Sequence, residues 1–480
     1  MALSDSQWLA WLNSEFKNPV VLVEAKYYDS TLKTLYFSDC GYIDPFDVNA
    51  PNYIAIIESK IVINNSLQSS ILSNLDIYNF DNALLNYQFI GQDFKVFYGD
   101  KSWPRADFRQ EAFNKVANFS SSNPRSFTFE FEDIGKKYFN QLIIGNGTGA
   151  QAGLPFVFGK CFNVQPIRED ATHYSYFTPA VISFPSEVRD RGVPLVLGGG
   201  ADYTLSVTVD GSGDGLKITI VFAVIPSGEI TCDIELNEFP IGTPLPNEST
   251  IDKILTQTNS YVAAPITIAS SVSGFNDTYL GYVCYNYITT GQMLNEMCDS
   301  IGANPRINSD GELELIRVTT GGTATRTVDD SDIFGFISLE QKEPPYLALS
   351  VGYQKNWKLQ TTNLVDSLTD AEYALYARDF TYVSDSASLP AYPFEVAQKR
   401  DTLIYDLTDA TNELDRRFAL RSSERSVWKL RGNLSFVYDK IGTTISIKTE
   451  DYGMSAGNDF VVISNSLNLS DNYCEVKVWK

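Results

Sequence analysis

The stretch GNGTGA, residues 145–150, decides between two fold classes for this chain. Its G-x-G-x-x-A spacing, directly after the run QLII at 141–144, matches a dinucleotide-binding fingerprint. In that fold the glycine loop leads straight into a helix whose free amides bind the pyrophosphate. Here Gly153 and Pro155 interrupt such a helix, and the β-like run FVFGKCFNV follows at 156–164. We therefore interpret the glycines as a loop between strands.

Two other ligand motifs also fail on spacing. Gly153 to Lys160 does not make a phosphate-binding loop, because five residues separate the glycines and Cys161 stands where a magnesium-binding Ser or Thr belongs. Asp210 and Asp214 flank a glycine-rich turn, but the glutamate and the helix pair of a calcium-binding EF-hand are missing. The sequence predicts neither a cofactor nor a metal site.

Cysteine and histidine usage points away from redox, metal and triad chemistry. No two cysteines form a Cys-x-x-Cys pair and none has a neighbouring histidine, so we expect reduced core residues. The six cysteines are at positions 40, 161, 232, 284, 298 and 474. The only histidine, His173, is expected to be a loop residue and not a catalytic base.

Carboxylate catalysis is the chemistry that is hardest to exclude, because a glycosidase needs only two suitably spaced acids. Glu130 and Glu132 are one nominal pair, and Asp329 and Asp330 are another. The first pair alternates with phenylalanines along an apparent strand, so both acids should point outward. The chain contains no Gly-x-Ser-x-Gly elbow and no His-Glu-x-x-His. We predict no catalytic, cofactor-binding or metal-binding residues.

Composition describes a folded protein that does not bind nucleic acid specifically. The 480 residues are 44% hydrophobic and 13% aromatic, and the length favours two to four domains. With 37 basic and 59 acidic residues, the net charge of −22 disfavours DNA binding and anionic membranes. The start of the chain lacks a signal-peptide pattern, and apolar runs such as 218–225 are too short to cross a bilayer. We expect synthesis in a cytoplasm and no membrane insertion.

Local patterns predict a short helix followed by strands in the first third. Residues 4–7, SDSQ, form a capping box. The apolar face of the following helix is expected to consist of Trp8, Leu9, Leu12 and Phe16. The strand-like runs are 20–23, 35–37, 53–57, 94–98 and 127–131.

The later segments read as further strands with two clear helices. Residues 203–239 predict a small β module, and 289–318 predict a capped helix packed on a hairpin that turns at 310–311, with Met297 and Cys298 in the core. Apolar spacing predicts a helix over 407–418 with a basic end. The closing runs 427–430, 444–448, 460–463 and 474–479 alternate like half-buried antiparallel strands. The fold class is mainly β with short helices (α+β), in several domains.

Several segments, in this order, resemble the tail hub, or baseplate hub and tail-tip assembly, proteins of long-tailed bacteriophages. They are LYFS at 35–38 with GYIDP at 41–45 and YIA at 53–55, LPFVFG at 154–159 with NVQP at 163–166, 287–313, VGY at 351–353 with NW at 356–357, the helix around Leu414, and VKVW at 476–479. The shared order extends over much of the chain. It accounts for the glycine loop as a connector before the strand at 156.

The resemblance implies a homotrimer with two tube-like antiparallel β-barrel modules per chain, forming a pseudo-sixfold ring that continues the tail tube. It suggests hub modules at 1–180 and 336–480, a small β module at 181–245, and a helix-hairpin module at 246–335. The implied location is the distal tail of the virion. The implied partners are a distal tail or tube protein, a tape-measure protein and a central spike or fibre.

DNA would pass through such a ring without specific binding. The acidity of the chain would then either line the channel or simply keep the protein soluble. The rival functions are a tail-associated enzyme that degrades glycan and a receptor-binding module that stacks aromatic side chains on sugars.

Overall fold

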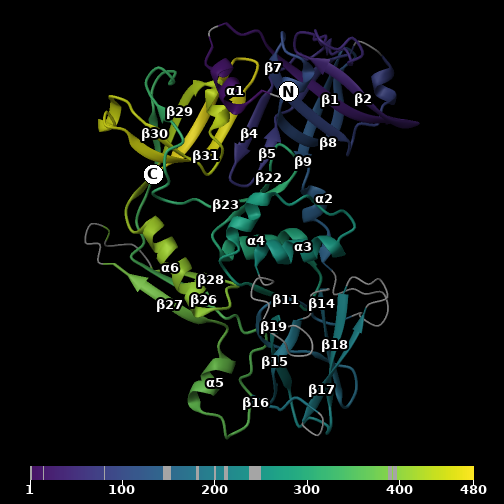
Figure 1. Ribbon diagram of the computed structural model, residues 1–480, viewed down its shortest axis with the longest axis vertical. Coiled ribbons are helices and arrows are strands. Elements are labelled where there is room, and N and C mark those ends of the chain that lie inside the picture. Colours follow the sequence, from purple (N-terminus) through teal and green to yellow (C-terminus); the bar gives the residue numbers. More distant parts are fainter. Residues whose placement is uncertain are drawn as a thin grey trace. The chain divides into compact units, whose positions relative to one another are not determined.

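The computed structural model describes residues 3–14, 16–79, 82–143, 153–179, 183–198, 202–209, 215–236, 250–387, 392 and 397–480 (Figure 1). The chain is mainly β with short helices, which confirms the predicted fold class. The glycine stretch 145–150 lies outside the described residues, as do Asp210 and Asp214 of the predicted turn. Their interpretation stays a prediction.

The chain divides into two compact units, each assembled from separate parts of the sequence. Unit 1 comprises residues 1–136, 304–343 and 424–480, and unit 2 comprises 137–303 and 344–423. The predicted division into four consecutive domains stays a prediction. The two units are described one after the other.

Unit 1 contains a seven-stranded sheet. In spatial order its strands are β3 (Ile54–Ala55), β2 (Thr31–Ser38), β1 (Pro19–Asp29), β7 (Asp93–Asp100), β8 (Arg109–Asn123), β9 (Ser126–Asp133) and β6 (Leu75–Tyr78). All neighbours are antiparallel except β2 and β3. Every predicted strand of the first third is present. The fifteen-residue β8 was missed, because its polar sequence RQEAFNKVANFSSSN lacks a strong apolar alternation.

The second sheet of unit 1 has eight strands. They are β24 (Thr327–Val328), β30 (Thr444–Ile447), β31 (Asn458–Asn468), β32 (Tyr473–Trp479), β29 (Arg425–Asn433) and β25 (Ser338–Glu343), with β4 (Val62–Ser66) paired to β31 and β5 (Ser70–Leu72) paired to β4. The pairing of β4 with β31 brings Asn65 opposite Asn465, and their side chains share a 2.9 Å hydrogen bond. One sheet therefore unites segments about 400 residues apart.

One hydrophobic core lies against both sheets of unit 1. Alternate side chains enter it, such as Val21 and Val23 from β1 and Val476 and Val478 from β32. On β1 and β7 the opposite face is covered in part as well, by a second buried cluster that includes Val20, Leu22 and Phe97. The remaining elements of unit 1 are the hairpin β22 (Asn304–Ile307) and β23 (Leu313–Ile316), helix α1 (Asp5–Leu12), and the 3-10 turns η1 (Asn82–Asn86), η2 (Arg105–Asp107), η4 (Leu434–Tyr438) and η5 (Asp451–Gly453).

Helix α1 begins as predicted but ends earlier. Ser4 and Gln7 form the expected capping box, and Trp8 and Leu12 are buried. The helix stops at Leu12, with Asn13 as its C-terminal cap. Phe16 therefore lies beyond the helix and is 92% exposed. Its predicted place on the apolar face is wrong, because the periodicity was extended past the end of the helix.

Unit 2 contains two sheets that share a core. The first comprises β17 (Tyr203–Val209), β18 (Gly215–Phe222), β14 (His173–Pro179), β11 (Phe156–Gly159) and β20 (Gly281–Cys284), with β13 (Ile167–Arg168) on β14. The second comprises β12 (Cys161–Val164), β19 (Ile230–Leu236), β15 (Ser183–Asp190) and β16 (Val193–Pro194). Tyr176, Ile218 and Ile234 are fully buried between them. The predicted strands of residues 203–239 belong to these two sheets.

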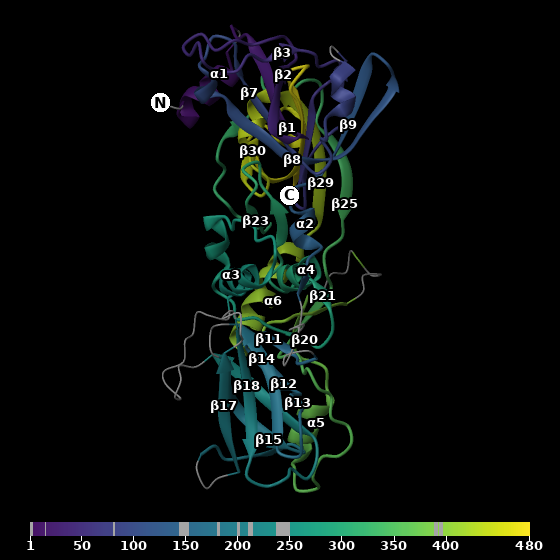
Figure 2. The ribbon, with the colours of Figure 1, turned by 90° about the vertical axis from the view of Figure 1, so that its right-hand side faces the viewer.

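The other elements of unit 2 are helices and short strands. They are α2 (Lys136–Phe139) at the unit boundary, α3 (Ile251–Tyr261), η3 (Ser270–Phe275), α4 (Thr290–Ser300), α5 (Asp370–Ala377), α6 (Leu407–Arg421), the pair β10 (Leu142–Ile143) and β21 (Ile288–Thr289), and the sheet β27 (Thr381–Ser386), β26 (Ala348–Tyr353) and β28 (Gln398–Asp401). Figure 2 shows α3 and α4 above the sheets of this unit.

The helix-hairpin segment is confirmed element by element. Thr289 and Gln292 form the predicted capping box of α4, and Met297 and Cys298 are buried. The hairpin β22–β23 turns at Gly311, where a φ of +85° suits glycine. The helix belongs to unit 2 and the hairpin to unit 1. The packing of one on the other stays a prediction.

Candidate functional site

His173 does not have the surroundings of a catalytic base. It is the first residue of β14, not a loop residue as predicted, and its side chain is 40% exposed. Its Nδ1 lies 2.9 Å from Asp170 Oδ1 and 3.2 Å from Thr172 Oγ1. A triad needs the acid on one ring nitrogen and the nucleophile on the other. Here Asp170 and Thr172 both lie at Nδ1 of His173, so these three side chains stabilise a surface turn.

The cysteines are all free thiols, and five of the six are buried. Burial raises the pKa of Cys161 and Cys232 well above the ordinary thiol value, which makes both unreactive. Cys40 is exposed, so its predicted core position is wrong. It lies in the turn that follows β2, next to Gly41 with a φ of +77°.

The first carboxylate pair lies on the outer face of the seven-stranded sheet. Phe129 is fully buried in the core of unit 1, and Phe131 packs against that core. Glu130 and Glu132 alternate with them on β9 and therefore point the opposite way, as predicted. Glu132 is paired with Lys136.

The second pair lies in an exposed turn. Asp329 accepts a 2.9 Å hydrogen bond from the backbone N–H of Ser331 and a second from its hydroxyl. These bonds lower the pKa of Asp329, so it stays ionised and is a poor general acid. Asp330 is also exposed. The arrangement is a turn stabilised by its own side chains.

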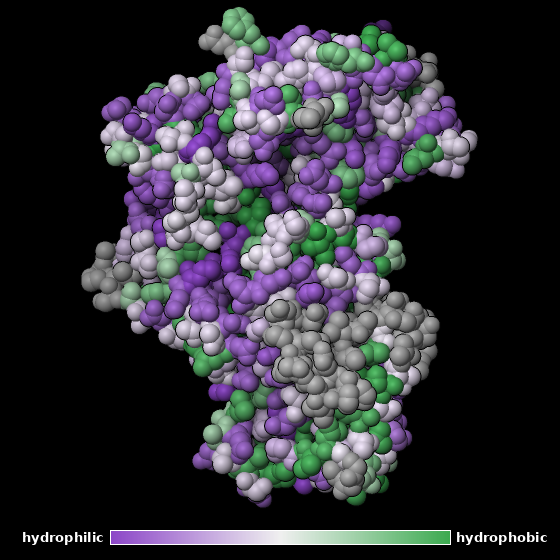
Figure 3. Space-filling model, in the orientation of Figure 1, coloured by the Kyte–Doolittle hydropathy of each residue, from purple (hydrophilic) through white to green (hydrophobic). Residues whose placement is uncertain are grey.

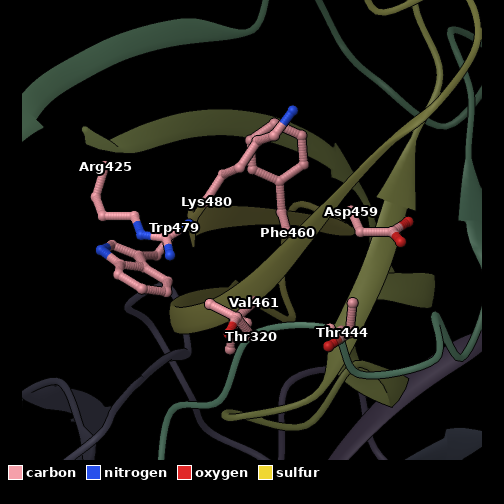
Figure 4. A pocket seen from close by; sticks show the side chains of 9 residues that line it. Thr320, Arg425, Thr444, Asp459, Phe460, Val461, Trp479 and Lys480 are labelled. Atoms are coloured by element: carbon pink, nitrogen blue, oxygen red, sulfur yellow. The ribbon is translucent and has the colours of Figure 1, made fainter. Parts of the chain in front are cut away.

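A small pocket opens beside the eight-stranded sheet of unit 1 (Figure 4). Its volume is about 180 Å³, less than the roughly 300–1,000 Å³ of usual ligand pockets. The residues that line it are Thr320, Gly321, Arg425, Thr444, Asp459, Phe460, Val461, Trp479 and Lys480.

The cations of this pocket are held by aromatic rings. The Arg425 guanidinium lies 5.1 Å from the Trp479 ring centroid, and Lys480 Nζ lies 5.6 Å from that of Phe460. Figure 4 shows Asp459 directed away from both cations. With a single carboxylate, the pocket cannot supply the two acids of a glycosidase. We assign it to packing at the sheet end.

The outer face of the seven-stranded sheet carries paired charges. Lys26 Nζ lies 2.7 Å from Asp93 Oδ2, and Lys115 binds the other carboxylate oxygen. Burial opposes ionisation of Asp93, but the two ammonium groups outweigh it and lower its pKa. Arg105 donates to Glu24 at 2.8 Å on the same sheet. This face is therefore mixed in sign and internally neutralised.

The outer face of the eight-stranded sheet has the same character. Lys429 lies 2.9 Å from Glu475, and Lys477 lies 2.7 Å from Glu340. These side chains alternate along β29 and β32 with core residues such as Leu430 and Val476. Glu475 on β32 lies one strand from Lys429, and Glu340 on β25 lies two strands from Lys477, so each lysine is matched by an acid of the same sheet.

A buried charge pair in unit 2 had no signal in the sequence. Arg189 on β15 is 3% exposed and forms a two-pronged pair with Asp233 on β19. Its guanidinium lies 5.4 Å from the Phe162 ring centroid and 5.2 Å from that of Tyr376. Asn163 donates its backbone N–H to Asp233 at 2.9 Å. The group joins β12, β15, β19 and α5.

This buried group extends into a polar network. The Asn163 amide donates to Asn356 at 3.0 Å and to the Lys358 carbonyl at 2.6 Å. The Gln360 amide in turn donates to Glu229 at 3.3 Å. The buried amides of this network bond to one another, to backbone carbonyls and to Glu229. We therefore infer that the network holds residues 356–376 against the sheets.

Neither metal nor membrane chemistry has a structural candidate in the described ranges. No three His, Cys, Asp or Glu side chains gather there as a metal site would require. Among the same residues, no helix is long and apolar enough to span a membrane.

No protein-family model matches the chain, and no curated protein matches it. Three solved structures align with 96% of it. The tail protein from Neisseria meningitidis MC58 has 8% identity, 97% coverage and a TM-score of 0.37. The 43 kDa tail protein of prophage MuSo2 from Shewanella oneidensis has 8% sequence identity, is covered over 98% of its length and gives a TM-score of 0.42. The prophage tail protein gp18 from Listeria monocytogenes EGD-e has 7% sequence identity, is covered over 94% of its length and gives a TM-score of 0.45. With TM-scores below 0.5, these likenesses carry no argument.

Proposed function

We propose that this chain is a structural, non-catalytic protein of a phage tail. In this proposal three copies form the hub at the distal end of the tail. The ring joins the tail tube to the tip or fibres and provides the channel through which DNA leaves. The three aligned structures are all of tail proteins, which agrees with this proposal, although the proposal does not rest on them.

The observation that carries the proposal is the pair of large sheets in unit 1. One chain supplies a seven-stranded and an eight-stranded sheet that share one hydrophobic core, and paired charges lie on the opposite face of each. Three chains would therefore supply six such sheets, which is the number that continues a hexameric tube. Closed symmetric rings are also a common solution for burying sheet edges between copies.

The segments of the hub resemblance fall on these sheets. Residues 35–38 lie on β2 and 53–55 lead into β3, while 476–479 end β32 in the partner sheet of unit 1. Residues 154–159 and 163–164 lie on β11 and β12 of unit 2. The resemblance therefore runs through the sheets of both units.

The charge pattern suits a surface along which DNA moves. Cations bind DNA when phosphate contacts release counterions, and a lysine already matched by a carboxylate contributes less to this release. On the two outer faces Lys26, Lys115, Lys429 and Lys477 each have such a partner. Three copies would carry three times the net charge of −22, which repels phosphate further.

A reconstruction of the intact tail tip, together with native mass spectrometry of the purified protein, tests the proposal. We expect three copies in a ring at the distal end and a mass three times 53.5 kDa. A monomer, or hydrolysis of peptidoglycan or capsule that is lost in Glu130→Gln or Asp329→Asn, would support the enzyme rival instead.

The charge argument has its own test in assembled particles. Glu340→Gln with Glu475→Gln leaves Lys429 and Lys477 unmatched, so DNA should be retained more strongly at low salt and ejection should slow. Asp330→Asn is the matched control, because it removes an exposed acid that lies on neither sheet. Equal ejection from both variants would show that these faces do not meet DNA.

A further inference from the structure

Within the described part of the chain, strand β17 is a largely uncovered sheet edge. It pairs with β18 over its full length, from Tyr203 opposite Phe222 to Val209 opposite Leu216. It is the outermost strand of its sheet, as the lower part of Figure 2 shows. Among the described residues, only the segment 196–198 reaches its other side, and only at Tyr203. Figure 3 shows hydrophobic residues at the surface in the region of this sheet.

Several other described edges are protected in ways that hinder strand addition. Strand β25 carries Glu340 and Lys342 and has an irregular register between Leu339 and Gln341. Strands β27 and β28 contain charged residues, β16 is two residues long and contains Pro194, and β12 and β20 are buried. The sequence of β17, YTLSVTV, contains no charge, proline or glycine.

The direction of the backbone groups of β17 follows from its contact with 196–198. The N–H of Tyr203 donates to the Val196 carbonyl, and the Tyr203 carbonyl accepts from Gly198. Tyr203 therefore directs its backbone groups away from β18. Because direction alternates along a strand, Leu205 and Val207 do the same. Within the described chain no hydrogen bond reaches the outward groups of these two residues.

The side chains of β17 are symmetric about Ser206. Thr204, Ser206 and Thr208 are exposed on one face, while Leu205 and Val207 pack against the core on the other. If a second β17 lies antiparallel with Ser206 opposite Ser206, Leu205 meets Val207 and Thr204 meets Thr208. In this register the outward groups of Leu205 and Val207 form hydrogen-bonded pairs, and Ser206 forms the non-hydrogen-bonded pair at the centre.

The geometry points to β17 as a homotypic interface, at which a second copy of this chain adds its own β17 across a two-fold axis. Four backbone hydrogen bonds join the copies, two from each pair of Leu205 and Val207. Hydroxyl side chains meet across one face and aliphatic side chains across the other, and both combinations favour cross-strand pairing. An isologous contact needs this self-complementarity.

A second copy is the occupant that the symmetry of β17 about Ser206 favours. Each chain carries −22, so two copies repel each other over most of their surfaces. The edge of β17 is uncharged over seven residues, which lets the copies meet there without like charges in contact. The contact is small, so pairing should be concentration-dependent.

Sedimentation equilibrium of the full-length chain with Ser206→Lys and Ser206→Glu tests this interface. Each variant places two like charges opposite each other at the two-fold axis, where Cα atoms of a non-hydrogen-bonded pair are about 4.5 Å apart. We expect the dissociation constant to rise about tenfold or more in either variant alone. An equimolar mixture should restore pairing, because Lys then lies opposite Glu.

Ser386→Lys is the matched control, since it makes the same change on the exposed edge strand β27 and should leave the mass unchanged. Circular dichroism shows whether each variant is folded. Wild-type and both Ser206 variants with the same mass at all concentrations would overturn the proposal. A mixture of the two variants that pairs no better than either variant alone would also overturn it. That result is expected if the natural occupant of the β17 edge is a different protein.

This interface is independent of the proposed hub. If wild-type protein has two copies and Ser206→Lys has one, the pairing stands and the trimer fails. If wild-type and variant both have three copies, the trimer stands and the pairing fails. Six copies that become three in the variant would support both.

Discussion

The charge pairs on the outer sheet faces of unit 1 contrast with a buried charge pair in unit 2. In unit 1 most ion pairs lie on the outer faces of two large sheets, as for Lys477 and Glu340, which are 46% and 31% exposed. In unit 2 the pair of Arg189 and Asp233 is buried between sheet and helix. The outer pairs shape a surface, whereas the inner pair binds segments that are far apart in sequence.

The contrast also separates what charge contributes to stability from what it contributes to function. Exposed pairs contribute about 0–1 kcal/mol, because water and salt screen them. Breaking a buried pair leaves an uncompensated charge and costs several times more. The outer faces of unit 1 can therefore change their charges at little cost in stability, whereas the buried pair of unit 2 cannot lose one partner cheaply.

The largest effect is expected at the buried pair. Arg189→Ala leaves Asp233 without its partner, so the free energy of unfolding of unit 2 should fall by about 3–5 kcal/mol. Urea unfolding measures this loss.

Arg168→Ala, in an exposed strand of the same unit, is the control and should cost under about 1 kcal/mol. The double variant Arg189→Met with Asp233→Leu should recover much of the loss. Equal losses for Arg189→Ala and Arg168→Ala would end the contrast.

Asp439 tests whether a buried charge in unit 1 behaves as in unit 2. Its side chain is fully buried beside Arg326, at 2.9 Å. Burial raises the pKa of Asp439 to about 6, although Arg326 opposes the shift. The folded chain therefore binds this proton more tightly than the unfolded chain, whose Asp titrates near 3.9. The contribution of Asp439 to the free energy of unfolding therefore falls by about 2 kcal/mol as the pH rises from about 4 to about 6.

Thermal unfolding across this pH range, in wild-type protein and Asp439→Asn, isolates the contribution. The amide cannot titrate, so the variant should lack this part of the decline. Parallel pH profiles would contradict the assignment.

Helix caps should not distinguish the two units. Ser4 caps α1 in unit 1 and Thr289 caps α4 in unit 2, each in a capping box. Ser4→Ala and Thr289→Ala should each cost about 1 kcal/mol, since each removes the acceptor for a free backbone N–H. Chemical denaturation measures both, and Thr289→Ser should retain most of the stability. A cost near zero in one unit only would mean that its helix is held by packing alone.

The smallest effect is expected on the outer faces. Lys477→Gln removes the exposed pair with Glu340 and should change stability by about 0.5 kcal/mol or less. The same measurement at 1 M salt should reduce even this difference, because the Debye length is then about 3 Å. A loss comparable to that of Arg189→Ala would show that the outer pairs hold the sheets together.

Single helices, turns and strands could be predicted because the residues that specify each of them lie close together in the sequence. The capping boxes at Ser4 and Thr289, the turn at Gly311 and the closing strands each depend on residues a few positions apart. The outward position of Glu130 and Glu132 also followed from simple alternation along one strand. Phe16 and Cys40 were misplaced because periodicity and residue type do not show where an element ends.

The sequence by itself determined a mainly β chain with capped short helices, since hydrophobic period and turn residues act over single elements. Only the tertiary structure decided that β4 joins β31 across 400 residues, that Arg189 finds Asp233, and that β17 becomes an uncovered edge. These outcomes depend on which surfaces come together when the core is buried. Such contacts join distant residues and leave no periodic pattern in the chain.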